Sequence, residues 1–198
     1  MTTQYVRNIL KIYRKATHDD VANGIEWYAR AKREADSIAA STNLNVHTVI
    51  GVMAALSPNN KWERNKRDAA NMCVAYVSGR DVETFAVSTY NTMKRKAWSI
   101  LQDNLSNHDD ILTRLNGQKI RSFYSNIVGL DEVTIDGHAY NIAIAKRQGL
   151  TSNDTNIGVR MYRELQAAYI RAAKRVGVEP HVLQAITWTA WKRIHNIL

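Results

Sequence analysis

Asp136 is the residue whose type and position best suit catalysis. It follows the short apolar run Val133-Thr134-Ile135 and stands at the start of a helix expected from His138 to Arg147. A carboxylate fixed there could stabilise positive charge that develops in a transition state, or orient and deprotonate an attacking water or amine. Asp is also a common helix cap, so its position alone leaves a purely structural role open.

A predicted helical hairpin precedes this carboxylate. Asn116-Gly117 predicts a tight turn, and the second helix opens at Gln118-Lys119 and stops at Gly129. Backbone N–H groups at such a helix start can face a phosphate, so Gly117, Gln118 and Lys119 form a candidate phosphate anchor beside the charge of Arg121. Lys119 would be a nucleophile if its pKa were depressed; otherwise it is a phosphate-contacting or solvated lysine.

A second candidate contact surface follows a helix that is apolar nearly all round, 46–56. Ser57 and Pro58 break that helix, and Asn60 is expected to cap the next one. The candidate DNA-contacting residues of this loop and helix start are Asn59, Asn60, Lys61, Trp62 and Arg64. The alternative is that Trp62 packs half-buried and the charges form a solvated face.

Other polar side chains receive supporting or structural roles. His138 is expected to bond backbone or position Asp136 rather than act as a general acid, and Tyr140 lines the same turn. Ser57 lacks the context of a nucleophilic serine, and Trp188 either stacks on a base or belongs to the core. The histidines show no metal-ligand spacing, so no metal site is expected.

Composition favours a polyanionic partner. The chain of 198 residues has 27 Lys and Arg against 18 Asp and Glu, a net charge of +9. This excess favours nucleic-acid binding through counterion release, although solubility alone could explain it. One cysteine, Cys73, and the lack of a membrane-length apolar run lead us to expect a cytoplasmic protein without a membrane partner, with a monomer favoured.

The apolar spacing is helical almost throughout, and no strand alternation is convincing, which predicts an all-α fold. Expected helix starts are Thr17, Asn45 and Pro180. After Thr17 we expect one helix with its inward face formed by Val21, Ile25, Tyr28 and Ala29. The polar segments 104–110 and 151–158 are expected to be connections.

Three segments in register resemble the helix-hairpin-helix DNA glycosylase superfamily, the endonuclease-III-like enzymes. These are V-M-A-A-L-S-P-N-N-K-W-E-R-N (52–65), Y-N-T-M-K-R-K-A-W-S-I-L (90–101) and the stretch from Leu115 to Tyr140. In the last, Gly117, Lys119, Asp136 and His138 fall on the family's hairpin glycine, following lysine, essential aspartate and histidine. The chain departs from the family in having a single hairpin glycine and Gly137 where threonine is common.

The resemblance implies a two-lobed fold with an active-site cleft between the lobes. The central lobe would span 46–135 and the second lobe 1–45 with 136–198. The implied activity is cleavage of the N-glycosidic bond of a damaged or modified base in double-stranded DNA by Asp136, with possible strand cleavage through Lys119. The cysteines that hold an iron–sulfur cluster in some members are absent, so no cofactor is implied beyond a monovalent cation at the hairpin.

Two alternatives stay open. Some phage-encoded relatives of this superfamily are thought to install side groups on hypermodified thymines, and the short chain without cluster cysteines suits that role in a bacterial or phage-infected cell. The other alternative is a DNA-binding protein without catalytic activity.

Overall fold

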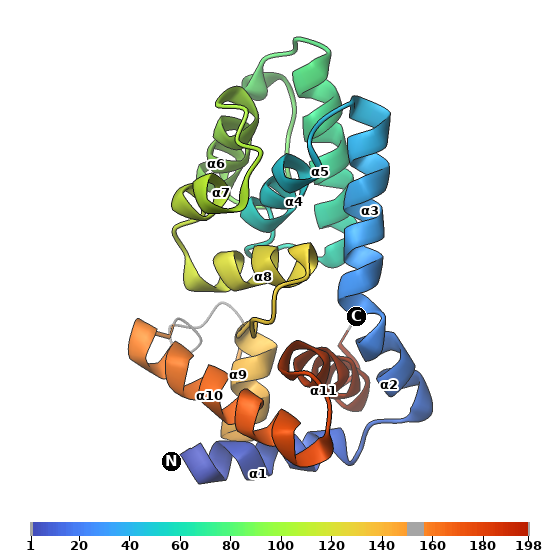
Figure 1. Ribbon diagram of the computed structural model, residues 1–198, viewed down its shortest axis with the longest axis vertical. Coiled ribbons are helices and arrows are strands. Elements are labelled where there is room, and N and C mark those ends of the chain that lie inside the picture. The colour runs from blue at the N-terminus through green and yellow to red at the C-terminus, as the bar shows by residue number, and fades with distance from the viewer. Residues whose placement is uncertain (1, 150–156, 198) are drawn as a thin grey trace. The chain divides into compact units, whose positions relative to one another are not determined.

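The computed structural model describes residues 2–149 and 157–197, and within them every regular element is helical (Figure 1). The all-α prediction is therefore confirmed. The helices are α1 (Thr2–Tyr13), α2 (His18–Ile25), α3 (Trp27–Thr42), α4 (Val46–Ala55), α5 (Trp62–Val77), the 3-10 helix η1 (Val82–Thr84), α6 (Asn91–Gln102), α7 (His108–Arg114), α8 (Gln118–Val128), α9 (Gly137–Ile144), α10 (Val159–Val176) and α11 (Pro180–Ile194). Most of the connection predicted at 151–158 lies outside the described residues.

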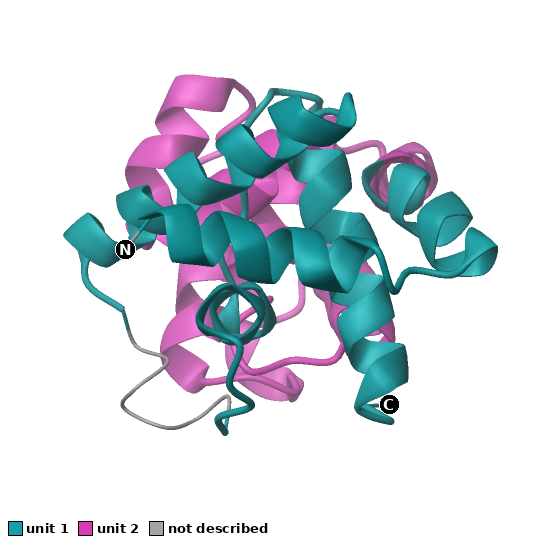
Figure 2. Ribbon diagram, turned by 90° about the horizontal axis from the view of Figure 1, so that it is seen from below, with its two compact units in different colours: residues 1–28, 129–198 teal, residues 29–128 magenta. Residues whose placement is uncertain are grey.

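The chain forms two compact units, coloured separately in Figure 2. Unit 1 comprises residues 1–28 and 129–198, and unit 2 comprises residues 29–128. The sequence had suggested 46–135 for the central lobe, so unit 2 both begins and ends earlier than that range. The carboxylate of Asp136 and the hairpin before it therefore belong to different units.

Unit 2 is built on α4, which packs against α5, α6, α7 and α8. Residues 48–55 of α4 are all buried, as expected for a helix that is apolar nearly all round. Asn45 begins the helix by accepting a hydrogen bond from His47 N at 2.8 Å. Gly51 allows close approach, since a Cβ there would lie 3.0 Å from Ile111 of α7.

Unit 1 gathers helices from both ends of the sequence. α1 packs against α9, α10 and α11, and α2 lies along α11. Thr17 starts α2 with a reciprocal capping box, in which its hydroxyl accepts from Asp20 N and the Asp20 carboxylate accepts from Thr17 N. Pro180 occupies the first turn of α11, and Gly177 ends α10 with a φ of 72°. The starts at Thr17 and Pro180 agree with the predictions from the sequence.

The helix expected after Thr17 is in fact two helices. α2 ends at Ile25, Glu26 caps it, and α3 begins at Trp27. The prediction of one helix with a single inward face from Val21 to Ala29 is therefore wrong. Tyr28 is buried as predicted, but Ile25 is 51% exposed and Ala29 is exposed as well.

Each described helix is too short or too polar to cross a bilayer on its own. No single helix among them combines the length and apolar character needed to cross a bilayer. Taken together, α3 and α4 would have that length and composition, but they are bent by 119° relative to each other.

Candidate active site

Asp136 is held at the start of α9 by the segment that precedes it. Val133, Thr134 and Ile135 are buried, so this extended run is anchored in unit 1. The Tyr162 hydroxyl accepts a hydrogen bond from Ile135 N at 3.1 Å and donates to Val133 O at 3.4 Å. These contacts fix the backbone immediately before the carboxylate.

The Asp136 carboxylate receives a donor on each oxygen. Its Oδ1 accepts from Ala139 N at 2.8 Å, which makes Asp136 the N-cap of α9 as predicted. Its Oδ2 accepts from the indole N–H of Trp188 in α11 at 3.0 Å. A carboxylate has about four acceptor positions, so two donors fix its orientation and leave capacity for a further partner. Asp136 is only partly buried, which is compatible with access by a substrate.

Trp188 is itself held by three neighbours. The ring of Trp27 meets it edge-on with centroids 6.1 Å apart, and His138 does the same at 6.1 Å. Lys192 lies one turn further along α11, with its ammonium 4.6 Å from the centre of a Trp188 ring. The indole therefore has a defined position from which to orient Asp136.

His138 is buried and neutral. Burial lowers its pKa below the ordinary value, and the charge of Asp136 opposes this shift only in part. Its Nδ1 is buried without a hydrogen-bond partner, while its ring packs on Trp188. A neutral histidine in this position is suited to positioning rather than to donating a proton. Tyr140 is partly buried and packs against the hydrophobic core of unit 1.

A buried polar pair lies on the same face of α11, one turn before Trp188. Tyr28 donates a hydrogen bond to Gln184 Oε1 at 3.0 Å, and burial raises the pKa of the phenol, so it stays neutral. The His181 ring meets Tyr28 edge-on at 5.8 Å. Positions 181, 184, 188 and 192 are three or four residues apart and so share one helix face.

The role of this face of α11 in the site was not predicted from the sequence. Trp188 was expected to be a stacking or core residue, not the partner of Asp136. Gln184 and Tyr28 received no polar role. The available signal was the polar and aromatic stripe His181, Gln184, Trp188 and Lys192 on an otherwise largely apolar helix.

The predicted hairpin is present in unit 2, with α7 ending at Arg114 and α8 beginning at Gln118. Gly117 is not in the left-handed region, and a Cβ there would meet only Ile120 at 3.4 Å, so neither its backbone conformation nor its surroundings require glycine. Arg121 donates to Leu112 O at 2.6 Å and thereby joins the two helices of the hairpin. Lys119 lies on the first turn of α8 and is partly buried.

The loop after α4 is organised differently from the prediction. The N-cap of α5 is Lys61, whose side chain makes no capping bond, and not Asn60. The Asn60 amide instead donates to Leu56 O and to Asp68 Oδ2, both at 3.2 Å. It closes the end of α4 because the chain turns back there, with Asn59 left-handed at a φ of 51°.

The remaining residues of this surface differ in exposure. Lys61, Arg64 and Asn59 are exposed. Trp62 is partly buried and meets Phe123 of α8 edge-on at 6.4 Å, so the loop and the hairpin helix are brought together within unit 2. The Ser57 hydroxyl is buried without a hydrogen-bond partner.

The described His, Cys, Asp and Glu side chains do not gather into a metal site. In residues 2–149 and 157–197, no group of three or more His, Cys, Asp or Glu side chains is placed to hold a metal ion. Cys73 is buried, and burial raises the pKa of its thiol to about 12.

Comparison with known proteins identifies a family but no activity. Residues 1–195 match the family described as "Family of unknown function (DUF7178)", and the chain belongs to that family. No curated protein and no solved structure matches the chain. Arguments about function therefore depend on the residues of the site.

Proposed function

We propose that this protein is a DNA glycosylase-like enzyme of the helix-hairpin-helix type, which binds duplex DNA and cleaves the N-glycosidic bond of a modified or damaged base. The observation that supports this most is the carboxylate of Asp136, which caps α9 and is held by Trp188 through its second oxygen. In the resemblance of roughly residues 45–150 to that superfamily, Asp136 falls on the essential aspartate.

Asp136 would have two roles, which are to stabilise positive charge on the sugar and to accept a proton from the attacking water. Cleavage of the glycosidic bond leaves its electron pair with the base and builds positive charge on the sugar, which a fixed carboxylate stabilises. Water then bonds to the anomeric carbon, and Asp136 accepts the proton that the water loses. The two hydrogen bonds already present hold the carboxylate in one orientation, so little reorganisation is needed during the reaction.

The hairpin would supply DNA contacts. Backbone N–H groups at the start of α8 and the charges of Lys119 and Arg121 suit a phosphate. Arg121 already donates to Leu112 O, so it would both join α7 to α8 and attract DNA. Lys119 would provide strand cleavage only if it also attacked the sugar as an amine.

The test compares the wild type with Asp136→Asn on duplexes that carry uracil, oxidised, alkylated, mismatched and hydroxymethylated bases. The new side chain can keep the cap to Ala139 N through its amide oxygen, but its amide nitrogen cannot accept from Trp188. We expect base release by the wild type and a loss of about 100-fold or more in the variant, with DNA binding preserved. Asp81→Asn is the matched control, since Asp81 is an exposed carboxylate that caps η1 by accepting from Glu83 N.

Abasic product and strand breaks are scored separately, and borohydride trapping tests Lys119. Equal activity of the wild type and Asp136→Asn would contradict the catalytic role of Asp136. Failure to release any base while duplex binding persists would contradict excision, and would favour base modification or binding without catalysis.

A further inference from the structure

Basic side chains gather on two neighbouring helices of unit 1. We define the α1–α10 basic face by the exposed residues Arg7, Lys11, Arg14, Lys15, Arg160, Arg163, Arg171, Lys174 and Arg175. Residues 2–15 and 159–176 hold these nine cations and a single acidic residue, Glu164, a net charge of +8. The rest of unit 1 has four basic and eight acidic residues, a net charge of −4.

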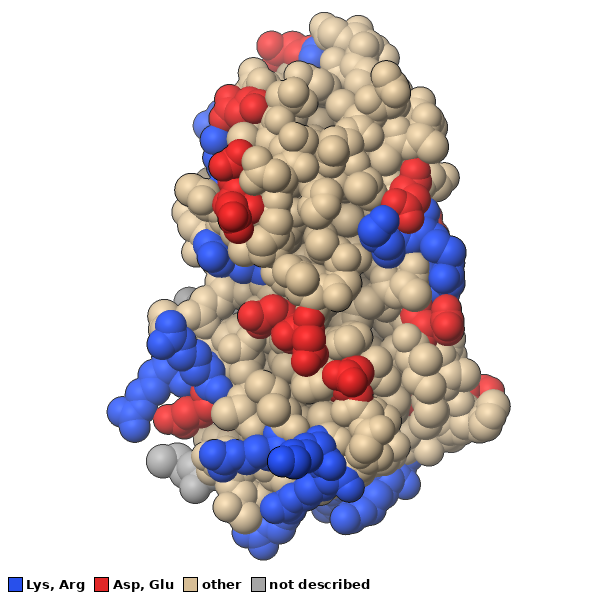
Figure 3. Space-filling model, viewed as in Figure 1, with Lys and Arg blue, Asp and Glu red and all other residues tan. Residues whose placement is uncertain are grey.

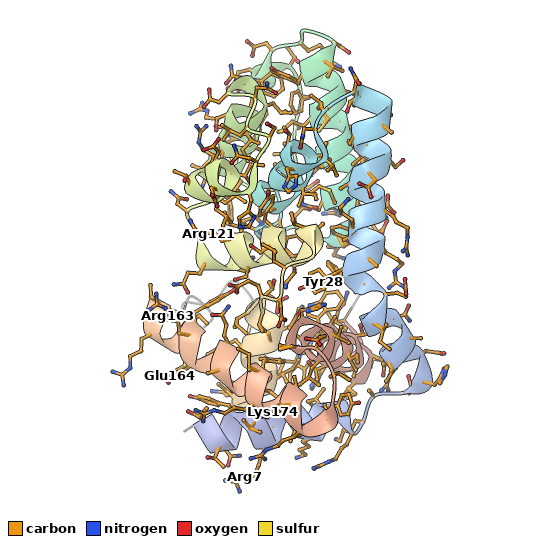
Figure 4. All side chains as sticks on the ribbon, in the orientation of Figure 1. Arg7, Tyr28, Arg121, Arg163, Glu164 and Lys174 are labelled. Atoms are coloured by element: carbon orange, nitrogen blue, oxygen red, sulfur yellow. The ribbon has the colours of Figure 1, made fainter. Side chains whose placement is uncertain are left out.

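The charge is therefore segregated within the unit rather than spread over its surface. α1 and α10 pack against each other, and their apolar faces are buried in the core of unit 1. Figure 3 shows Lys and Arg side chains gathered over these helices, and Figure 4 labels Arg7, Arg163 and Lys174 among them. Apolar packing holds the two helices in unit 1, and their basic side chains face outward.

Little within the described part of the chain neutralises this face. Among the ion pairs of the described residues, only that between Arg160 and Glu164, at 3.2 Å, involves it. Like charges held together repel one another and oppose folding. A polyanionic partner would relieve that repulsion and release its own counterions.

The spacing along α10 suits an extended anion. Arg160, Arg163, Arg171 and Lys174 follow one side of the helix, because their separations of 3, 8 and 3 residues approximate whole turns. From the first to the last they span about 21 Å at 1.5 Å per residue. One turn of DNA is about 34 Å long, so the row could follow the phosphates over more than half a turn.

We propose that the α1–α10 basic face binds the phosphate backbone of duplex DNA, as a contact surface additional to the hairpin. Six of its nine cations are arginine, which matches phosphate geometry better than lysine does. Insertion into a membrane is disfavoured because Tyr162, Leu165 and Tyr169, on the apolar side of α10, are buried in the protein core. The choice of duplex DNA rests on the proposed function, but the surface does not require base excision.

The test measures binding of a fluorescent 24-base-pair duplex by anisotropy between 50 and 300 mM KCl. The variant Arg163→Gln/Arg171→Gln/Lys174→Gln removes three charges from the face. The matched control, Arg33→Gln/Arg80→Gln/Arg95→Gln, removes three exposed charges from unit 2, outside the hairpin and outside the loop between α4 and α5. Circular dichroism melting confirms that both variants fold.

We expect the first variant to bind on the order of tenfold or more weakly at 100 mM KCl. Its plot of log K against log salt should be less steep by about 0.9 for each lost phosphate contact, up to about 2.7. The control should keep the wild-type slope. Equal effects of the two variants, or no effect of either, would overturn the proposal, as would wild-type binding to phosphatidylserine vesicles but not to DNA.

The two proposals fail in different ways. Loss of DNA affinity in the first variant, with no base released by the wild type on any duplex, supports this surface and contradicts excision. Base release by the wild type, with unchanged binding in the first variant, supports excision and contradicts this surface.

Discussion

Gly24 provides a sharp test of the packing that positions α11. It lies in α2 where this helix touches α11, and a Cβ placed on it would be 2.5 Å from Ile186 Cγ1 and 2.6 Å from both Ile186 Cα and Ile186 N. Two of the three atoms are backbone, so no side-chain rotation relieves the overlap. Gly24→Ala must push the helices apart by roughly 0.8 Å to reach an ordinary contact of 3.4 Å.

The expected cost follows from two opposing effects. Alanine in a helix interior gains about 1 kcal/mol over glycine. Overpacking of a well-packed contact typically costs about 1–3 kcal/mol, and a backbone clash belongs at or above the upper end of that range. The net loss should be about 2 kcal/mol or more, which lowers the melting temperature by about 4–8 °C for a chain of this size.

The assay is thermal unfolding followed by circular dichroism, with two further variants. Ala22→Gly, at an exposed position of the same helix, is expected to lose about 1 kcal/mol through propensity alone. Gly24→Ala should lose more, although its propensity change has the opposite sign. Gly24→Ala/Ile186→Ala should not recover, because the backbone contacts remain and a cavity is added. A melting temperature at or above that of the wild type, or rescue in the double variant, would refute this reasoning.

Two further predictions concern Asp136 and the histidines. Trp188→Phe keeps an aromatic ring but removes the N–H group that donates to Asp136. We therefore expect the free energy of unfolding to fall by about 1–2 kcal/mol, and kcat to change more than KM. Unchanged stability and activity would contradict this orienting role. Burial lowers the pKa of His47, with help from the charges of His108 and Lys32, and burial also lowers that of His138. The unfolded chain therefore binds protons first, so stability is complete above about pH 6.5 and falls as the pH drops below it. Melting temperatures from pH 8 to pH 5 should show this fall, and His47→Asn should reduce it; an equal fall in that variant would exclude His47 as a source.

Local features were predictable because their causes lie within a few residues. Thr17, Asn45 and Asp136 start their helices, since each side chain accepts a hydrogen bond from an N–H two or three residues ahead. The burial of α4 followed from its composition, and the start of α8 at Gln118 followed from the turn before it. One local signal was overlooked, because Asn107 caps α7 within the segment expected to be a connection.

Features that depend on packing were not predictable in this way. Asn60 was expected to cap α5, but it bonds to Asp68, whose position is set by the packing of α5. The break at Glu26 was not predicted from Gly24 two residues before it, and Ile25, the last residue of α2, is exposed instead of facing inward.

The sequence by itself determined that Asp136 is a helix-capping carboxylate that follows a buried apolar run. Only the tertiary structure decided what holds its other oxygen, because Trp188 is 52 residues away along the chain. The same is true of Tyr28 and Gln184, which are separated by 156 residues. Helix periodicity tells which residues share a face, but the neighbour of that face depends on how the helices pack, and no local pattern records this.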